Sequence, residues 1–349
     1  MHIYFKIRNI IPGLYCPGDL LKEGRLSMWR YIMQRLLWMI LIVFCVAIII
    51  FTIMYFVPGD PARIALGSTA TAEEIDNWRN MQGLNDSYTV QLTRYLSDVF
   101  LHLDFGTSYS FKVPVLQEFA KRIPRTLTLG LLVIIIDAAI GIPLGVTAAM
   151  NQNKPRDRVL MILSMAGVSI PDFWLALMLV ILFSLKLGWL PAMGIGGIKY
   201  WIMPVISASV AGIAMNARQT RSAVLETKRA DFVTTARAKG LKESKVIYKH
   251  MLPNALIPVI NNLGGQFAQV IAGTVVIESV FSFPGVGMYL LSGISARDYP
   301  VIRGCVLVLA VFAAFAVLIV DLIYAYLDPR IKAAYANSAA RKVKVKKNG

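Results

Sequence analysis

Long apolar stretches separated by polar segments set the pattern of this chain. A helix needs about 20 apolar residues to cross the hydrocarbon core of a bilayer. The stretches that meet or approach this length are residues 36–57, 127–150, 159–185, 201–217, 255–280 and 305–327. The third is interrupted by Pro171-Asp172, and the fourth is short and rich in Ser, Ala and Gly. The pattern predicts an all-α membrane protein with six transmembrane helices.

Composition agrees with this class. Of the 349 residues, 56% are hydrophobic and only 16% are charged, whereas a soluble domain is about a quarter charged. The chain therefore lacks the polar surface of a soluble globular domain. Its three cysteines show no disulfide or zinc-ligand spacing, so we interpret them as reduced structural thiols.

The distribution of Lys and Arg predicts the orientation. Most of the 36 lie in residues 1–35, 151–158, 218–254 and 328–349, which fall on one side if there are six spans. Positive loops stay in the cytoplasm, so both termini are predicted to be cytoplasmic. This bias accounts for the net charge of +16 without nucleic acid. The basic tail 328–349 would also attract anionic lipid headgroups.

Two segments outside the predicted spans are long enough to have a role. Residues 58–126 are predicted to be an external helical segment, because Thr71 and Glu74 have capping-box spacing and Gly83 follows as a helix end. Simple packing over the span ends and docking of a partner both remain open for this segment.

The cytoplasmic loop 218–254 is basic and favours helix. One short helix is predicted from Asp231 to Gly240 and another from Lys242 to His250, with Leu252-Pro253 ending the second before the next span. Such a helix–glycine–helix knuckle fits a groove on a partner. The alternative is a basic connector that faces lipid.

No motif for nucleotide binding, zinc-dependent hydrolysis or a serine nucleophile occurs in the sequence. The sequence therefore predicts a protein that is not an enzyme and that takes its energy from elsewhere.

Polar residues within the predicted spans are the remaining candidates for function. The fifth span carries amides on one helical face, at Asn262, Gln266 and Gln269. They would line a pathway or form hydrogen bonds between helices. The acids within or near spans are Asp137, Asp172, Glu278 and Asp321. We favour structural roles for all of these acids, with capping or salt bridges at the last two.

Residues of the cytoplasmic loop resemble a known signature. In the permease subunits of binding-protein-dependent ABC importers this signature is E-A-A, three residues, G, nine residues and I-x-L-P. The corresponding residues are Thr234, Thr235, Ala236, Gly240, His250, Leu252 and Pro253. Ala236, Gly240, Leu252 and Pro253 match, and the other three positions are substituted.

Further motifs resemble the first-permease type of the dipeptide, oligopeptide and nickel branch. They are Pro58-Gly-Asp-Pro61, Leu103-Asp-Phe-Gly106, Gly141-Ile-Pro-Leu-Gly145, Gly188-Trp-Leu-Pro191, Val276-Ile-Glu-Ser-Val-Phe-Ser-Phe-Pro-Gly285 and Asp321-Leu-Ile-Tyr-Ala-Tyr-Leu-Asp-Pro-Arg330. The resemblance covers about residues 28–332. Residues 1–27 lie outside it, as a true extension or as a stretch upstream of a start at Met28, which we favour slightly.

The resemblance implies one permease subunit of an ATP-driven importer for di- or oligopeptides in a prokaryotic plasma membrane. Two permeases form the pathway, two cytoplasmic ATPases bind ATP and Mg, and an external substrate-binding protein delivers the cargo. The knuckle would couple to an ATPase, and this chain would hold no cofactor or metal. The alternatives are the same machine importing nickel or a nickel chelate, and a secondary carrier that works alone.

Overall fold

The computed structural model describes residues 17–67 and 69–327, and it describes side chains from residue 32 onward apart from 272, 321 and 323–327. The basic tail predicted at 328–349 and the first sixteen residues of the predicted N-terminal segment lie outside the described residues. The described part is helical, as predicted, and its only β-type pairing is an isolated bridge between Thr107 and Pro114.

The helices in chain order are α2 (Pro17–Phe56), α3 (Pro61–Leu66), α4 (Ala72–Gln82), α5 (Tyr88–His102), α6 (Val115–Met150), α7 (Pro155–Ser169), α8 (Asp172–Leu179), the π-helix η1 (Val180–Lys186), α9 (Lys199–Lys228), α10 (Asp231–Ala238), α11 (Glu243–Lys245), the π-helix η2 (Val246–Met251), α12 (Leu252–Val280), α13 (Val286–Ser295) and α14 (Tyr299–Leu327).

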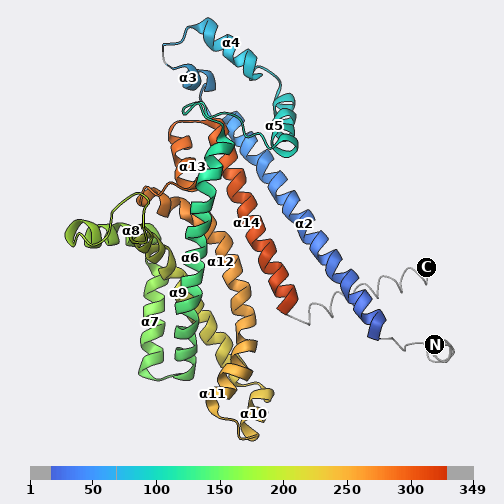
Figure 1. Cartoon of the computed structure of the whole chain (residues 1–349), viewed down its shortest axis with the longest axis vertical. Helices are drawn as coiled ribbons and strands as arrows, with labels where there is room; N and C mark the ends of the chain where they lie inside the picture. The colour runs from blue at the N-terminus through green and yellow to red at the C-terminus, as the bar shows by residue number, and fades with distance from the viewer. Residues whose placement is uncertain (1–16, 68, 328–349) are drawn as a thin grey trace, which may run out of the picture.

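The long helices form a bundle with α9 near its centre. Helices α6, α7 and α12 pack against α9, α14 packs against α12, and α2 packs on the outer side of α14 (Figure 1). Helices α3–α5 lie at one end of the bundle, and α10 and α11 lie at the other end (Figure 1). The two non-spanning segments that the sequence singles out are therefore at opposite ends of the molecule.

Helices α6 and α9 approach each other at glycines of α6. A Cβ atom at Gly141 would lie 2.9 Å from the carbonyl oxygen of Ile213, and one at Gly145 would lie 2.5 Å from that of Ala217. Glycines four residues apart let two helix backbones come close in a membrane. Because the contacts advance along both helices together, α6 and α9 run in the same direction.

Four helices are long and apolar enough to cross a membrane: Ile32–Phe56, Val115–Met150, Lys199–Lys228 and Tyr299–Val320. The number rises to six if each of two bent pairs counts as one span. One pair, Pro155–Ser169 with Asp172–Lys186, is bent by 95°, and the other, Glu243–Ile271 with Gly273–Val280, by 50°. The larger bend lies at Pro171, whose ring and missing N–H disrupt a helix.

The helices differ from the predicted segments in several places. Helix α6 begins at Val115, twelve residues before the predicted segment, and α2 begins at Pro17 rather than at residue 36. Helix α9 continues to Lys228 because no proline or glycine interrupts it after the apolar part. Leu252-Pro253 does not end a helix, since η2 passes directly into α12 and Pro253 occupies the first turn, where its missing N–H is tolerated. Helix α13 was not predicted, because its short apolar run was assigned to a loop.

Helix α4 has the predicted caps. Thr71 Oγ1 accepts from the backbone N–H of Glu74 at 3.3 Å, Glu74 Oε2 accepts from that of Thr71 at 2.8 Å, and Gly83 ends the helix with φ of 64°. Helix α5 is fixed to the end of α2 by a hydrogen bond of 2.7 Å between the hydroxyls of Tyr88 and Thr52. These contacts fix the ends of α4 and join α5 to α2.

Candidate functional site

The cytoplasmic loop predicted from the sequence forms a compact knuckle, made of α10, a turn at Gly240, α11 and η2. Gly240 has φ of 72°, a left-handed conformation that favours glycine. Across this turn the Arg237 guanidinium donates two hydrogen bonds to the Glu243 carboxylate, at 3.1 and 2.6 Å. The turn is thus held by one backbone feature and one exposed ion pair.

One face of the knuckle packs against the rest of the chain. Val233 and Ala236, three residues apart on α10, are buried together with Val246 and Met251 of η2. Their cluster includes residues at the adjoining ends of α6, α9 and α12. A displacement of the knuckle would therefore be transmitted directly to these three helices.

Two large apolar side chains of the knuckle are exposed. Phe232 is 44% exposed and Tyr248 is 67% exposed. Exposed apolar side chains that gather on a polar surface mark a docking site, and these two are the candidates on the knuckle. Thr234 and Thr235 of α10 are exposed as well.

The seven residues of the predicted coupling register do not share one face. Thr234, Thr235, Gly240 and Pro253 are exposed, and His250 and Leu252 are half-buried. Ala236 is only 5% exposed and belongs to the internal cluster. Ala236 therefore packs within the chain. It lies three residues after Val233, on the same buried face of α10.

The three amides of α12 also occupy different environments. Gln266 is 6% exposed, and its Oε1 accepts a hydrogen bond of 2.9 Å from Nδ2 of the fully buried Asn216 on α9. Asn262 is half-buried, and Gln269 is exposed. Gln266 thus makes the interhelical contact that was the alternative to a pathway role, and Gln269 lies on an open face.

That open face of α12 carries two glycines. Gly265 and Gly273 flank Gln269 at four-residue spacing, and nothing lies within 4 Å of a Cβ atom built at either glycine. Asn261 is exposed on the same side. The face can therefore accept a close neighbour or bound water along its length.

The acids within the bundle differ in burial. Asp137 of α6 is 1% exposed, and its carboxylate lies so close to Gly212 of α9 that a Cβ there would collide with it. Asp172 is exposed in the first turn of α8, where a helix N-terminus favours negative charge. Asp321 belongs to α14, and its side chain lies outside the described residues.

Two family models match the chain. Residues 141–333 match the model of the binding-protein-dependent transport system inner membrane component, and residues 28–130 match its N-terminal counterpart. The chain belongs to this family. It is therefore a transport permease of the inner membrane, as the resemblance implied.

Curated relatives of this permease cover most of its length. It is 38% identical over 333 residues to the dipeptide transport system permease protein DppB of Alkalihalophilus pseudofirmus, covering 87% of this chain and 100% of the relative. It is 38% identical over 305 residues to the glutathione transport system permease protein GsiC of Salmonella paratyphi A, covering 87% and 99%.

Among solved structures, the permease resembles a chain of the MetNI methionine ABC transporter in an inward-facing conformation. The TM-score is 0.54 at 17% identity, over 61% of this chain and 97% of the other. At this identity the likeness concerns the fold alone.

One ion pair of the permease was missed by the sequence reasoning. Asp157, at the start of α7, accepts two hydrogen bonds from the Arg221 guanidinium of α9 at 2.6 and 2.8 Å, and a third from the Asn153 backbone N–H at 2.9 Å. The Asp157 side chain is 4% exposed and that of Arg221 is 25% exposed. Its only sequence signal is an acid in the first turn of a helix, which does not identify a distant partner.

Glu278 of the permease caps a helix that the sequence did not predict. The carboxylate is fully buried, and it accepts hydrogen bonds from the Thr126 hydroxyl at 2.6 Å and the Met288 backbone N–H at 3.0 Å, in the first turn of α13. A Cβ atom at Gly285 would collide with this carboxylate. In the motif Val276–Gly285, Glu278 and Gly285 therefore depend on each other: the buried carboxylate fits only because Gly285 has no side chain.

Proposed function

We propose that this permease is the membrane subunit of an ATP-driven importer of di- and oligopeptides, and that it forms half of the translocation pathway. The observation that carries the proposal is the knuckle, which exposes Phe232 and Tyr248 and packs onto three long helices at the end of the bundle. The curated relatives support a peptide cargo, since one transports dipeptides and the other glutathione. Neither relative supports the nickel alternative, and membership of a binding-protein-dependent family argues against a carrier that works alone.

We propose six passages through the membrane with both termini in the cytoplasm. Helices α6 and α9 run in the same direction, so the chain between them must return to the end where it started. The bent pair formed by α7 with α8 and η1 is the segment that makes this return. In this orientation the knuckle is cytoplasmic and α3–α5 are external, in agreement with the distribution of positive charge.

The knuckle is proposed to dock in a groove of a cytoplasmic ATPase. Phe232 and Tyr248 would enter the groove, with Thr234 and Thr235 at its edge, while Gly240 sets the turn. The knuckle would be joined to the bundle by the remaining residues of the coupling register, Ala236, His250, Leu252 and Pro253. Closure of two ATPases, which bind the ATP and Mg, would move the ends of α6, α9 and α12 and switch the pathway between its two openings.

The pathway is proposed to lie along the open face of α12. Gln269 would offer its amide to the peptide, and Gly265 and Gly273 would keep the surface narrow. Across the pathway we place a second permease subunit, with an external substrate-binding protein above both. Gln266 would hold α12 to α9, and Asn262 would lie at the border of the pathway.

The test is co-purification from the native membrane followed by mass spectrometry. Two ATPases, a second permease and a binding protein are expected with the tagged chain. Phe232→Ser and Tyr248→Ser should lose the ATPases, whereas Met81→Ser, an 83% exposed residue at the opposite end on α4, should retain them. Recovery of a lone stable chain, even after cross-linking, would contradict the proposal.

A second test concerns the turn itself. Gly240→Pro should abolish peptide uptake while the chain still inserts in the membrane, because proline cannot adopt the positive φ of Gly240. Uptake of a labelled dipeptide by cells measures this. Normal uptake by the variant would rule out a coupling role for the knuckle.

A further inference from the structure

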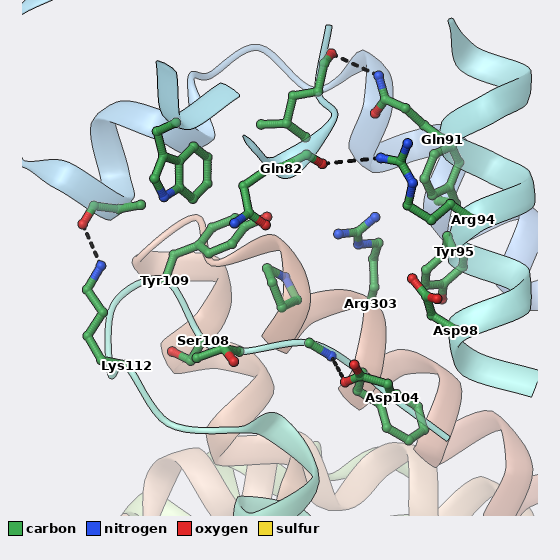
Figure 2. Close-up of a pocket in the computed structure, with 18 residues that line it drawn as sticks. Gln82, Gln91, Arg94, Tyr95, Asp98, Asp104, Ser108, Tyr109, Lys112 and Arg303 are labelled. Atoms are coloured by element: carbon green, nitrogen blue, oxygen red, sulfur yellow. Dashed lines mark hydrogen bonds between the residues drawn. The ribbon is translucent and has the colours of Figure 1, made fainter. Parts of the chain in front are cut away.

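A cavity of about 470 Å³ lies beneath the external helices, where they meet the ends of α2 and α14 (Figure 2). A second cavity of about 420 Å³ adjoins it, and the two share five lining residues: Phe51, Leu84, Gln91, Tyr109 and Arg303. Each is of the size of typical small-molecule sites, roughly 300–1,000 Å³. The sequence reasoning assigned no role to any of these residues.

Arg303 is held in place but keeps free donors. Its guanidinium lies 5.1 Å from the ring centre of Tyr95 and 5.6 Å from that of Phe51, and its Nε donates to the Tyr299 carbonyl at 3.4 Å. Among the residues that the structure describes, no carboxylate or other acceptor is bonded to its two Nη atoms. Figure 2 shows the guanidinium near the middle of the cavity. An arginine fixed in this way is ready to bind a carboxylate through two parallel hydrogen bonds.

Asp98 supplies the opposite charge from α5, on another side of the same cavity (Figure 2). Its carboxylate has no hydrogen bond or ion pair within the described part of the chain, Arg303 included. The other cations of the cavity are engaged, since Arg94 pairs with Asp86 at 2.5 Å and Lys112 donates to the Ala65 carbonyl at 2.5 Å. A second carboxylate of the cavity, Asp104, accepts only the Gly106 backbone N–H at 2.8 Å. Within the described residues the cavity thus holds one cation without an acidic partner, Arg303, and one carboxylate without any hydrogen bond, Asp98.

Aromatic rings form part of the remaining walls, beside polar side chains such as Gln82, Gln91 and Ser108. The rings of Trp78 and Tyr109 meet edge to face, with centres 5.2 Å apart, and both line the cavity together with Phe51 and Tyr95. Such walls bind apolar side chains of many shapes. A ligand suited to this site carries a carboxylate, an ammonium group and an apolar portion between or beside them.

We propose that the cavity binds a short zwitterionic peptide at the external end of the permease, with its carboxylate on Arg303 and its α-ammonium group on Asp98. The inference rests on the proposed function, because it takes the cargo to be a peptide and α3–α5 to be external. It adds a site outside the membrane pathway, where peptide released from the binding protein is held by its two charged ends. Both ends are common to all unblocked peptides, so the site tolerates any sequence.

The test uses the full chain with its co-purifying partners in lipid nanodiscs, without the binding protein. Equilibrium dialysis compares radiolabelled alanyl-phenylalanine with its N-acetyl and C-terminal amide derivatives. We expect the free dipeptide to bind at least about tenfold more tightly than either derivative, which corresponds to about 1.4 kcal/mol. Asp98→Asn should lose the preference for a free amine and keep that for a free carboxylate.

Arg303→Lys should show the converse pattern, because lysine retains the charge over the rings but not the paired donors. The matched control is Arg94→Gln, which changes a cavity residue already bound to Asp86 and should preserve both preferences. Merely structural damage would weaken all three ligands alike, and that result would overturn the proposal. Absence of saturable binding to the wild type, or unchanged preferences in both variants, would also overturn it.

Two parallel measurements separate this inference from the proposed function. If the variants lower only the ATP hydrolysis stimulated by the binding protein and leave both ligand preferences intact, the cavity docks that protein and the peptide site is refuted. If wild-type cells take up dipeptide but Asp98→Asn and Arg303→Lys do not lose opposite ligand preferences, the proposed importer function is retained and the cavity inference fails. If neither uptake nor ATPase partners are found, the proposed function itself fails.

Discussion

The pair formed by Asp157 and Arg221 provides a quantitative test of how α7 is joined to α9. The carboxylate is 4% exposed and receives two hydrogen bonds from the guanidinium. If Arg221 is replaced by Gln, the buried carboxylate keeps only the Asn153 backbone donor at 2.9 Å. Removing one partner of a buried pair costs about 3–5 kcal/mol, because the remaining charge is left without compensation.

The exposed pair of Arg237 and Glu243 is the matched control within the same chain. Its hydrogen bonds are similar, at 2.6 and 3.1 Å, but its side chains are 36% and 51% exposed. Water replaces such a bond readily, so Arg237→Gln should cost no more than about 1 kcal/mol. The difference in destabilisation between Arg221→Gln and Arg237→Gln therefore measures the effect of burying the ion pair.

The assay is the midpoint of thermal denaturation of the purified chain in mild detergent, for Asp157→Asn, Arg221→Gln and the double variant. The double variant should be less destabilised than the sum of the single ones, with a coupling of about 1–3 kcal/mol. Additive losses, or an Arg221→Gln variant as stable as Arg237→Gln, would refute the reasoning.

Two further changes test local contacts. Gly285→Ala should reduce the yield of monodisperse protein in size-exclusion chromatography, since its Cβ would collide with Glu278, whereas Gly273→Ala, with nothing within 4 Å, should not. The backbone N–H and then the hydroxyl of Thr71 hold the pKa of Glu74 below its ordinary value of 4.5. This stabilisation of α4 is present above pH 4.5 and is lost as the pH falls through the lowered pKa, so amide exchange at 72–76 should approach that of Glu74→Ala only in acid. Equal exchange of the two proteins at neutral pH would contradict the capping.

The sequence by itself determined the helical class, the positions of the long apolar segments and the caps of α4. These features depend on local patterns: runs of apolar residues, the spacing of Thr71 and Glu74, and a glycine at the helix end. It also determined the knuckle, because Gly240 and the two short helical patterns beside it are neighbours in the chain.

Only the tertiary structure decided which polar residue meets which. Gln266 and Gln269 share a helical face in the sequence, yet one is bonded to Asn216 and the other is open, because α9 covers only part of α12. Similarly, Asp98 and Arg303 lie on helices far apart in the chain, α5 and α14, and nothing in either local sequence indicates that they line one cavity. Such pairs depend on how helices cross, and the crossing depends on small residues such as Gly141 and Gly145, whose partners lie far away in the chain.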